Sequence, residues 1–399
     1  MNVALLGHGT VGSGVAEILI QQEKTVASDA GQTVFLKSIL DVRSFPELSY
    51  ADRFVTDFSA IENDPEIAVV IECIGGLHPA FDYVKRALLK GKAVVTSNKE
   101  LVAEKGPELF ALAEKSGVPF LYEAAVGGTI PIIRSLATSF GGAAITRVAG
   151  ILNGTTNYIL TAMKRDGVSY EAALAEAQRL GYAEADPTAD VSGLDSGRKI
   201  AILASLIWKK AVSPSNVHLT GLSSVTSEQI AMADSLGYTI KLIADARKTG
   251  SGLSVAVSPM LIPKACPLSF VDDVNNAVLV SSPTNGDVLF YGRGAGKLPT
   301  AAAVVADVIS AVKTGAYDPS FSWRSEEKTN FSSEKKRFFV RITGAYPARI
   351  LEWIESLVPS SGPDEHVFFT VPVFEHEFTS LEAAIFEHGG SLSKIPVFE

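Results

Sequence analysis

The stretch NVALLGHGTVGSGVAEILIQQ (residues 2–22) decides the fold class. A short apolar run ends at Gly7 and helical periodicity starts at Val11, so the stretch predicts a strand, a tight turn and a helix. Gly7, Gly9 and Gly12 match G-x-G-x-x-G between these elements, the setting in which the pattern indicates dinucleotide binding. Gly7 would permit the turn, Gly9 a close approach of backbone N–H groups to a pyrophosphate, and Gly12 close helix packing. A glycine-rich turn without a ligand is the alternative.

Strand-like and helical segments alternate after this first unit. Further apolar runs stand at 34–40, 67–74, 92–96 and 118–122, with helical patterns at 79–90 and 101–116. This alternation predicts an α/β fold with a Rossmann-type doubly wound parallel sheet, covered by helices on both faces.

The pattern changes in the second part of the chain. Helical and strand-like segments mix there in an order typical of an α+β domain, and an Ala-rich apolar helix is expected at 298–314. Residues 315–336 show little periodicity and predict a linker. After it, RFFVRIT (337–343), a helix at 347–357 and another at 379–388 predict a small terminal α+β module.

Size and composition exclude several classes of protein. At 399 residues the chain exceeds the usual single-core size, and its formal charge of −9 without a basic stripe makes nucleic acid an unexpected partner. No apolar run is long enough for a membrane span, and no leader segment is evident before the first strand. The two cysteines, Cys73 and Cys266, lack metal-site or disulfide-framework spacing, so a cytoplasmic protein is expected.

Four places carry chemistry with two interpretations each. Asp41 and Arg43 follow the second strand, where an acid would bind a free ribose 2′-hydroxyl of NAD and an arginine the 2′-phosphate of NADP, or both are solvated surface charges. Lys99 ends another strand and is a site residue or a surface lysine. EAAVGGTIP (123–131) is a buried turn or a cation loop made of backbone carbonyls. Asp195 and Lys199, at i and i+4 of a helix, form a salt bridge or an acid–base pair.

Taken together, these motifs resemble the homoserine dehydrogenase family over about residues 1–315. The stretches that carry the resemblance are GHGTVGSGV (7–15), ECIGG (72–76), VVTSNKELVA (94–103), EAAVGGTIPIIRSL (123–136), GILNGTTNYIL (150–160), GYAEADPTADVSGLDSGRKIAILA (181–204) and GRGAGKLPTAAAVVAD (292–307). NGTTNYIL and YAEADPTADVSG are far more specific than the dinucleotide pattern.

The resemblance implies reversible NAD(P)H-dependent reduction of L-aspartate 4-semialdehyde to L-homoserine, on the route to threonine, methionine and isoleucine. It implies that Lys199 donates the proton, that Glu184 and Asp195 bind the substrate, and that Lys99 lies near the nicotinamide and the reacting centre. Cofactor contacts would come from the glycine-rich turn, from three further glycines and from Lys99. These residues are Gly7, Gly9, Thr10, Val11, Gly12, Gly75, Lys99, Gly181 and Gly296.

The resemblance also implies a monovalent cation, Na⁺ or K⁺, on the backbone oxygens of Glu123, Val126, Gly128 and Ile130, and a homodimer or homotetramer. The expected domains are 1–135 with 298–315 for dinucleotide binding, 136–297 for catalysis and dimerisation, a linker at 316–336, and an ACT-like module at 337–399.

This chain departs from the family pattern at two places. Thr129 stands where many relatives have glycine, beside the cation loop. In the terminal module, Ala345-Tyr346-Pro347-Ala348 replaces an acidic-x-Pro-Gly turn, so the module is either a threonine-binding regulatory domain or a dimerisation element. Two rival functions are a Rossmann oxidoreductase for another small aldehyde or hydroxy acid, and a non-catalytic sensor of dinucleotide and amino acid.

Overall fold

The computed structural model describes residues 1–250, 252–324, 334–360 and 364–399. Within it the chain forms two compact units. The first comprises Met1–Gly154, Asp195–Val217 and Val274–Thr329, and the second Thr155–Leu194, His218–Asp273 and Asn330–Glu399. The domain boundaries expected from the sequence stay a prediction, and residues 325–333 of the expected linker lie outside the described ranges.

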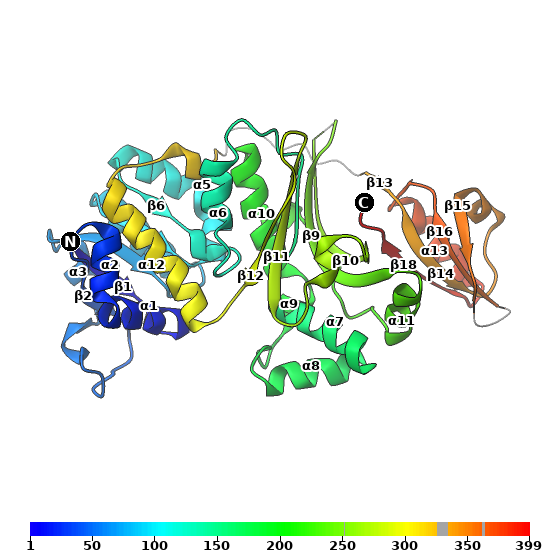
Figure 1. The fold of residues 1–399 in the computed structure, drawn as a ribbon, viewed down its shortest axis with the longest axis horizontal. Helices are drawn as coiled ribbons and strands as arrows, with labels where there is room; N and C mark the ends of the chain where they lie inside the picture. The colour runs from blue at the N-terminus through cyan, green and yellow to red at the C-terminus, as the bar shows by residue number, and fades with distance from the viewer. Residues whose placement is uncertain (251, 325–333, 361–363) are drawn as a thin grey trace. The chain divides into compact units, whose positions relative to one another are not determined.

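The first unit is built on a six-stranded parallel sheet with the order β3-β2-β1-β4-β5-β6. This is the doubly wound order, and it confirms the predicted fold class. Figure 1 labels β1, β2 and β6 of this sheet. The central strand β4 is almost wholly buried, as expected of a parallel strand covered on both faces. The strands are β1 (Asn2–Leu6), β2 (Phe35–Leu40), β3 (Phe54–Val55), β4 (Ile67–Glu72), β5 (Ala93–Thr96) and β6 (Phe120–Leu121).

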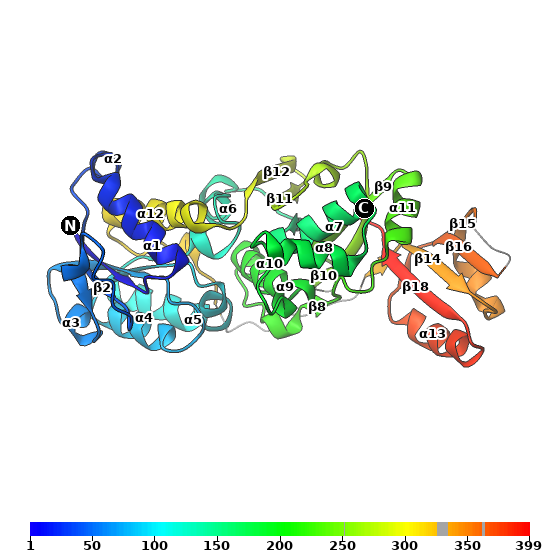
Figure 2. The same cartoon turned by 90° about the horizontal axis from the view of Figure 1, so that it is seen from below.

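Helices cover both faces of this sheet, with α1, α2 and α12 on one and α3, α4 and α5 on the other (Figure 2). Helix α12 returns from the late part of the chain and packs on α1. Asn98 caps α5 by accepting a hydrogen bond from the Leu101 N–H, and Gly117 ends that helix in a left-handed conformation. The helices are α1 (Thr10–Gln21), α2 (Glu23–Ala30), α3 (Ser59–Glu62), α4 (Ala80–Leu89), α5 (Lys99–Ser116) and α12 (Lys297–Thr314).

Three antiparallel strands and one long buried helix complete the first unit. Strand β11 pairs with β7 on one side and with β12 on the other. Helix α10 is buried along most of its length. The remaining elements are η2 (Glu123–Ala125), α6 (Ile132–Arg134), η3 (Ser135–Ser139), β7 (Arg147–Ile151), α10 (Leu194–Trp208), η4 (Pro214–Asn216), β11 (Asn275–Ser282), β12 (Gly286–Arg293) and η6 (Pro319–Phe321).

The second unit contains a long antiparallel pair, β9 and β10, with the short strand β8 parallel to β10. Helix α11 starts with a capping box between Thr226 and Gln229. The elements of this part are α7 (Gly154–Asp166), α8 (Tyr170–Arg179), α9 (Thr188–Val191), β8 (His218–Leu219), α11 (Ser227–Ser235), β9 (Tyr238–Lys248), β10 (Leu253–Pro263) and η5 (Pro267–Phe270).

The C-terminal residues of the second unit form a four-stranded antiparallel sheet, β15-β16-β14-β18, with α13 packed against it. The helix expected at 347–357 is wrong. Ile350 and Trp353 are three residues apart and both buried, which a 3₁₀ turn satisfies, and β15 then pairs with β16. The elements are β13 (Lys335–Lys336), β14 (Phe338–Thr343), η7 (Ala348–Trp353), β15 (Ile354–Val358), β16 (Glu365–Thr370), β17 (Val373–Phe374), α13 (Glu377–Glu387) and β18 (Ser391–Pro396). Across the described ranges, no helix is both long and apolar enough to cross a membrane.

Candidate active site

The glycine-rich turn leaves an open space in front of the N-terminus of α1. Gly7 has a φ of 88°, and a Cβ on Gly12 would come within 1.9 Å of the Gly7 carbonyl oxygen, so neither position accepts a side chain. Gly9 immediately precedes α1, and a Cβ there would meet nothing within 4 Å. The N–H groups of the first turn, which includes Thr10 and Val11, therefore have room for an anion.

The close approach of α1 to a neighbouring helix depends on a glycine that the pattern did not single out. A Cβ on Gly14 would lie 2.9 Å from both the Ala301 Cβ and the Lys297 carbonyl oxygen of α12. Gly12 lets α1 pack closely on the turn after β1, as expected, and Gly14 does the same in the contact with α12.

Asp41 and Arg43 are both hydrogen-bonded to the backbone of His8 in the glycine-rich turn. The Asp41 carboxylate accepts a 2.7 Å hydrogen bond from the His8 N–H and two 3.0 Å bonds from the Arg43 guanidinium. Arg43 also donates to the His8 carbonyl oxygen and lies over the Phe45 ring. Hydrogen bonds from Arg43 hold the pKa of Asp41 far below its usual value. The Asp41 side chain is 7% exposed and that of Arg43 59%, so the guanidinium is the group presented to solvent.

Glu72, at the end of β4, organises the loop that follows it. One carboxylate oxygen accepts hydrogen bonds from the Ile74 N–H at 2.8 Å and the Gly75 N–H at 3.1 Å, and the other accepts one from the Thr96 hydroxyl. The side chain is fully buried, and burial raises its pKa against the effect of these donors. Glu72 thereby links the Gly75 loop to the end of β5.

Lys99 is the first residue of α5, directly after the cap residue Asn98. The Asn98 amide group donates a 2.6 Å hydrogen bond to the Gly76 carbonyl oxygen. The same loop that Glu72 holds is therefore also fixed to the start of α5. The position of Lys99 follows from this network and from the capping of the helix.

Lys99, Asp195 and Lys199 come together around one carboxylate. The Lys99 Nζ lies 2.7 Å from Asp195 Oδ1, and the Lys199 Nζ lies 2.7 Å from Asp195 Oδ2. Lys199 also donates to the Leu152 carbonyl oxygen at 2.7 Å, and Asn153 donates to Asp195 at 3.0 Å. Both lysine ammonium groups are thus held next to the same carboxylate.

The electrostatics of this cluster keep its acid ionised. Burial alone would raise the pKa of Asp195, but the charges of Lys199 and Lys99 outweigh burial and lower the pKa below its usual value. The side chain of Lys199 is 11% exposed and that of Lys99 39%. A buried lysine next to an ionised carboxylate is a chemically reasonable donor of a proton to a carbonyl oxygen.

Gly181 and Glu184 belong to the second unit and are described within it. Gly181 has a φ of 76°, and Glu184 is exposed. The Thr155 hydroxyl donates a 2.7 Å hydrogen bond to the Tyr182 carbonyl oxygen, and Gln178 donates to the Glu184 carbonyl oxygen at 3.1 Å. These hydrogen bonds to backbone carbonyl oxygens therefore hold the loop that carries the Glu184 side chain.

The expected cation loop is buried from Glu123 to Gly128 and again at Ile130. The carboxylate of Glu123 accepts hydrogen bonds from the backbone N–H groups of Ile133 and Arg134, both at 2.8 Å, so it faces α6. Burial and the neighbouring Asp307 raise its pKa to about 7. No group of three or more His, Cys, Asp or Glu side chains in the described ranges could hold a metal ion.

Backbone oxygens remain as the possible ligands of this loop. A Cβ on Gly128 would lie 2.6 Å from the Gly294 carbonyl carbon and 2.7 Å from the Arg293 carbonyl oxygen. This close approach leaves no space for a side chain at position 128. Gly296, the last of the expected cofactor residues, precedes α12 with a φ of 127°.

Several residues around the site had no predicted role. Asn153 carried a signal, because it begins the NGTTNYIL motif, but the motif alone does not show that its amide contacts Asp195. Glu72 also stands in a family motif, but only the fold shows that its carboxylate holds the next loop. The 2.7 Å ion pair between Arg198 and Glu100, which joins α10 to α5, had no local sequence signal.

Comparisons with known proteins identify one family for the chain. Family models described as "Homoserine dehydrogenase, NAD binding domain" and "Homoserine dehydrogenase" match residues 7–123 and 131–309. The homoserine dehydrogenases of Synechocystis sp. and Bacillus subtilis are 46% and 43% identical to the chain, each match covering 78% of this chain and 73% of the relative.

Solved structures of the same family superpose on the chain. A homoserine dehydrogenase from Thiobacillus denitrificans matches with a TM-score of 0.92 and 34% identity, covering 100% of this chain and 98% of the other. A hyperthermophilic archaeal homoserine dehydrogenase in complex with NADPH matches with a TM-score of 0.66 and 26% identity, covering 78% and 97%.

Proposed function

The chain belongs to the homoserine dehydrogenase family, and from this membership we propose how its residues divide the work of the reaction. The reaction is the reversible, nicotinamide-dependent reduction of L-aspartate 4-semialdehyde to L-homoserine. The observation that carries the proposal is the Asp195 carboxylate, which holds the ammonium groups of Lys99 and Lys199 at 2.7 Å each.

Lys199 is the proposed proton donor. When bound, the nicotinamide cofactor supplies the hydride that reduces the aldehyde carbon. Lys199 delivers a proton from Nζ to the aldehyde oxygen, which becomes the hydroxyl of homoserine, and takes that proton back in the oxidative direction. Asp195 and the Leu152 carbonyl oxygen orient the ammonium group through the 2.7 Å contacts described above.

Glu184 and Asp195 are proposed to bind the substrate, whose amino acid portion carries an ammonium group that a carboxylate recognises. Lys99 adds positive charge beside the reacting centre, where an aldehyde oxygen gains negative charge during reduction. These roles require a substrate with an amino acid portion, which distinguishes the proposal from a dehydrogenase for simple aldehydes.

For the cofactor we propose NADP in preference to NAD. Asp41 is occupied by the His8 N–H and by Arg43, whereas the Arg43 guanidinium is more than half exposed at the end of β2. An exposed arginine there suits a 2′-phosphate, and a buried, hydrogen-bonded aspartate suits a free 2′-hydroxyl poorly. The archaeal relative named above was solved with NADPH. The glycine-rich turn, with Gly75, Gly181 and Gly296, is proposed to line this cofactor.

A monovalent cation, Na⁺ or K⁺, is proposed on the backbone oxygens of Glu123, Val126, Gly128 and Ile130. Its chemistry would be structural, because it would fix a loop that joins β6 to α6. The support is the burial of the loop and the close fit at Gly128. Activity measured with sodium, potassium and a bulky organic cation tests this site.

The assembly and the terminal module complete the proposal. We expect a cytoplasmic protein. We also expect a homodimer or homotetramer, since five of the eight residues of β12 are exposed, among them Tyr291 at 58%. The ACT-like module at 337–399 would bind threonine or support dimerisation. Inhibition by threonine favours the first role, and dissociation on removing the module favours the second.

The decisive experiment is homoserine-dependent reduction of NADP and NAD, measured side by side at slightly alkaline pH. Turnover that requires the amino group of homoserine is expected, with NADP the better cofactor. A folded protein that binds the dinucleotide without any turnover would contradict the proposal and support a non-catalytic sensor.

A further inference from the structure

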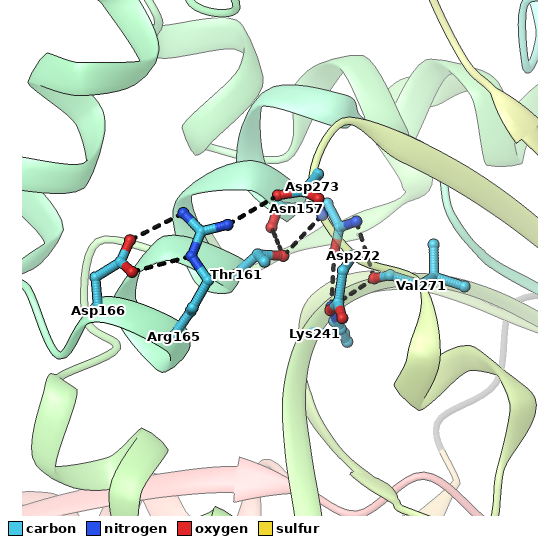
Figure 3. Close-up of polar contacts among 8 residues, drawn as sticks. All are labelled: Asn157, Thr161, Arg165, Asp166, Lys241, Val271, Asp272 and Asp273. Atoms are coloured by element: carbon cyan, nitrogen blue, oxygen red, sulfur yellow. Dashed lines mark hydrogen bonds and ion pairs between the residues drawn. The ribbon is translucent and has the colours of Figure 1, made fainter.

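A buried lysine in the second unit lies outside the residues that the proposed reaction uses. Lys241, the fourth residue of β9, has a side chain only 1% exposed. Its Nζ has a partner for each of its three N–H groups, namely Asn157 Oδ1 at 3.1 Å, the Val271 carbonyl oxygen at 2.5 Å and Asp272 Oδ1 at 2.9 Å (Figure 3). The ammonium group therefore joins a strand, a helix and a loop at one point.

The loop at 271–273 is tied to one face of α7 by residues spaced four apart. Asn157 donates to the Val271 carbonyl oxygen at 3.0 Å, the Thr161 hydroxyl accepts from the Asp273 N–H at 3.1 Å, and Arg165 pairs with Asp273 at 3.3 Å (Figure 3). Residues i, i+4 and i+8 lie on the same side of a helix. Lys241 binds Asn157, the residue of this row that lies nearest the N-terminus of α7.

The same turn of α7 contacts the loop that carries Glu184. Thr155 donates to the Tyr182 carbonyl oxygen at 2.7 Å, and the rings of Tyr158 and Tyr182 have their centroids 5.0 Å apart. Asn157 stands between these two contact residues in the helix, and Tyr182 precedes Glu184 by two positions. A shift of this turn would therefore move the backbone next to Glu184.

Burying an ammonium group costs free energy, because the charge loses its contact with water. An apolar side chain of similar volume usually stabilises such a position at least as well as a buried ion pair does, so fold stability is a weak explanation for Lys241. Burial lowers the pKa of Lys241, and the neighbouring Asp272 carboxylate opposes that effect. The three hydrogen bonds of its ammonium group explain the lysine better, because together they fix the position of the first turn of α7.

We propose that Lys241 is a positioning residue for the substrate site, because it fixes the first turn of α7 and, through Thr155 and Tyr182, the loop that presents Glu184. The proposal rests on the proposed role of Glu184 in binding the amino acid portion of the substrate. It assigns Lys241 an effect on substrate binding without contact to substrate or cofactor.

The test compares Lys241→Met with Lys164→Met by steady-state kinetics of the full-length protein. Lys164 is a matched control, since it also joins α7 to β9, through Thr239 at 3.1 Å, but at the other end of the helix. We expect Lys241→Met to raise the KM for homoserine roughly 5- to 20-fold, as small misplacements of binding groups do, with the KM for NADP unchanged. Lys164→Met should change neither. An unchanged homoserine KM in Lys241→Met, or an equal rise for both substrates, overturns the proposal.

Two further variants separate this proposal from the proposed function. Glu184→Gln should raise the homoserine KM, and adding Lys241→Met to it should raise that KM little more, because both changes act on one contact. If Glu184→Gln leaves the homoserine KM unchanged, the assigned role of Glu184 is wrong. A rise in that KM caused by Lys241→Met would then show that Lys241 does not act through Glu184. If Glu184→Gln raises the KM and Lys241→Met does not, only the present inference fails.

A milder variant covers the case in which Lys241→Met does not fold. Asp272 is 55% exposed, so Asp272→Ala removes one of the three acceptors of Lys241 at a position open to solvent. A smaller rise in the homoserine KM, with the NADP KM unchanged, is expected from it. A homoserine KM equal to that of the unmodified protein overturns the proposal in this arm as well.

Discussion

Lys99 Nζ lies 2.7 Å from Asp195 Oδ1, which joins the first residue of α5 to the first turn of α10. Lys199 binds the other oxygen of the same carboxylate, so one acid sets the position of two ammonium groups. The pairing brings the end of a strand of the dinucleotide-binding sheet to the helix that carries the proposed proton donor. Each group of this cluster can be removed separately.

Replacing Lys199 by Met removes the proton donor and keeps a side chain of similar length. We expect kcat to fall by roughly 10²–10⁴, as for the loss of a general acid, with little change in the KM for NADP. Lys85→Met is the control, because Lys85 pairs with Glu108 on the surface of the same unit. Normal turnover by Lys199→Met, measured as NADPH formation from homoserine, would show that another group moves the proton.

Replacing Asp195 by Asn tests the cluster through its pH dependence. The pKa of Asp195 is lowered in the fold, so its ionised form stabilises the native state above the pKa of the unfolded chain, about 3.9, and that contribution is lost as the pH falls below it. At pH 7 the variant should be less stable by about 3–5 kcal/mol, the usual result of breaking a buried pair. Urea unfolding at pH 7 and at about pH 2.5 measures both differences, and the difference between the two proteins should shrink only at the lower pH, where the unfolded chain binds the proton and the folded Asp195 resists it. A difference that already vanishes near pH 5 contradicts a lowered pKa of Asp195.

Local patterns predicted much of the fold and part of this cluster. Alternating strands and helices predicted the parallel sheet, and helical spacing predicted that Asp195 and Lys199 face each other. Contacts between distant segments had no local signal, and this is why Lys99 was placed near the reacting centre only by resemblance. The burial of Asp41 beneath Arg43 likewise depends on the turn at His8, which residue types alone do not reveal.

The carboxylate of Glu123 shows the same limit of local reasoning. The sequence predicted a cation on backbone oxygens of this loop and gave the Glu123 carboxylate no role of its own. In the fold the backbone N–H groups of Ile133 and Arg134 in α6 donate to its two oxygens. The helix expected at 347–357 became a 3₁₀ turn and a strand because pairing with β16 outweighed helical propensity. In both cases tertiary hydrogen bonds decided the outcome.

Replacing Arg43 by Gln tests the preference for NADP. Removing a guanidinium that binds a phosphate costs about 1.5–3 kcal/mol, so the KM for NADP should rise roughly 10- to 100-fold while the KM for NAD stays within about twofold. Arg53→Gln is the control, because the Arg53 guanidinium donates to the Leu36 carbonyl oxygen on the same strand β2. Equal changes for NADP and NAD would mean that Arg43 shapes the turn at His8 without reading the 2′-phosphate.

Replacing Glu72 separates its hydrogen bonds from its charge. Glu72→Ala leaves the Ile74 and Gly75 N–H groups without their acceptor, so the loop at 73–76 should lose its position and the KM for NADP should rise by roughly tenfold. Glu72→Gln keeps an oxygen for both N–H groups and should change this KM by less than about threefold. Fluorescence titration with NADPH measures binding without turnover, and equal affinities of the two variants would mean that the loop at 73–76 does not contact the cofactor.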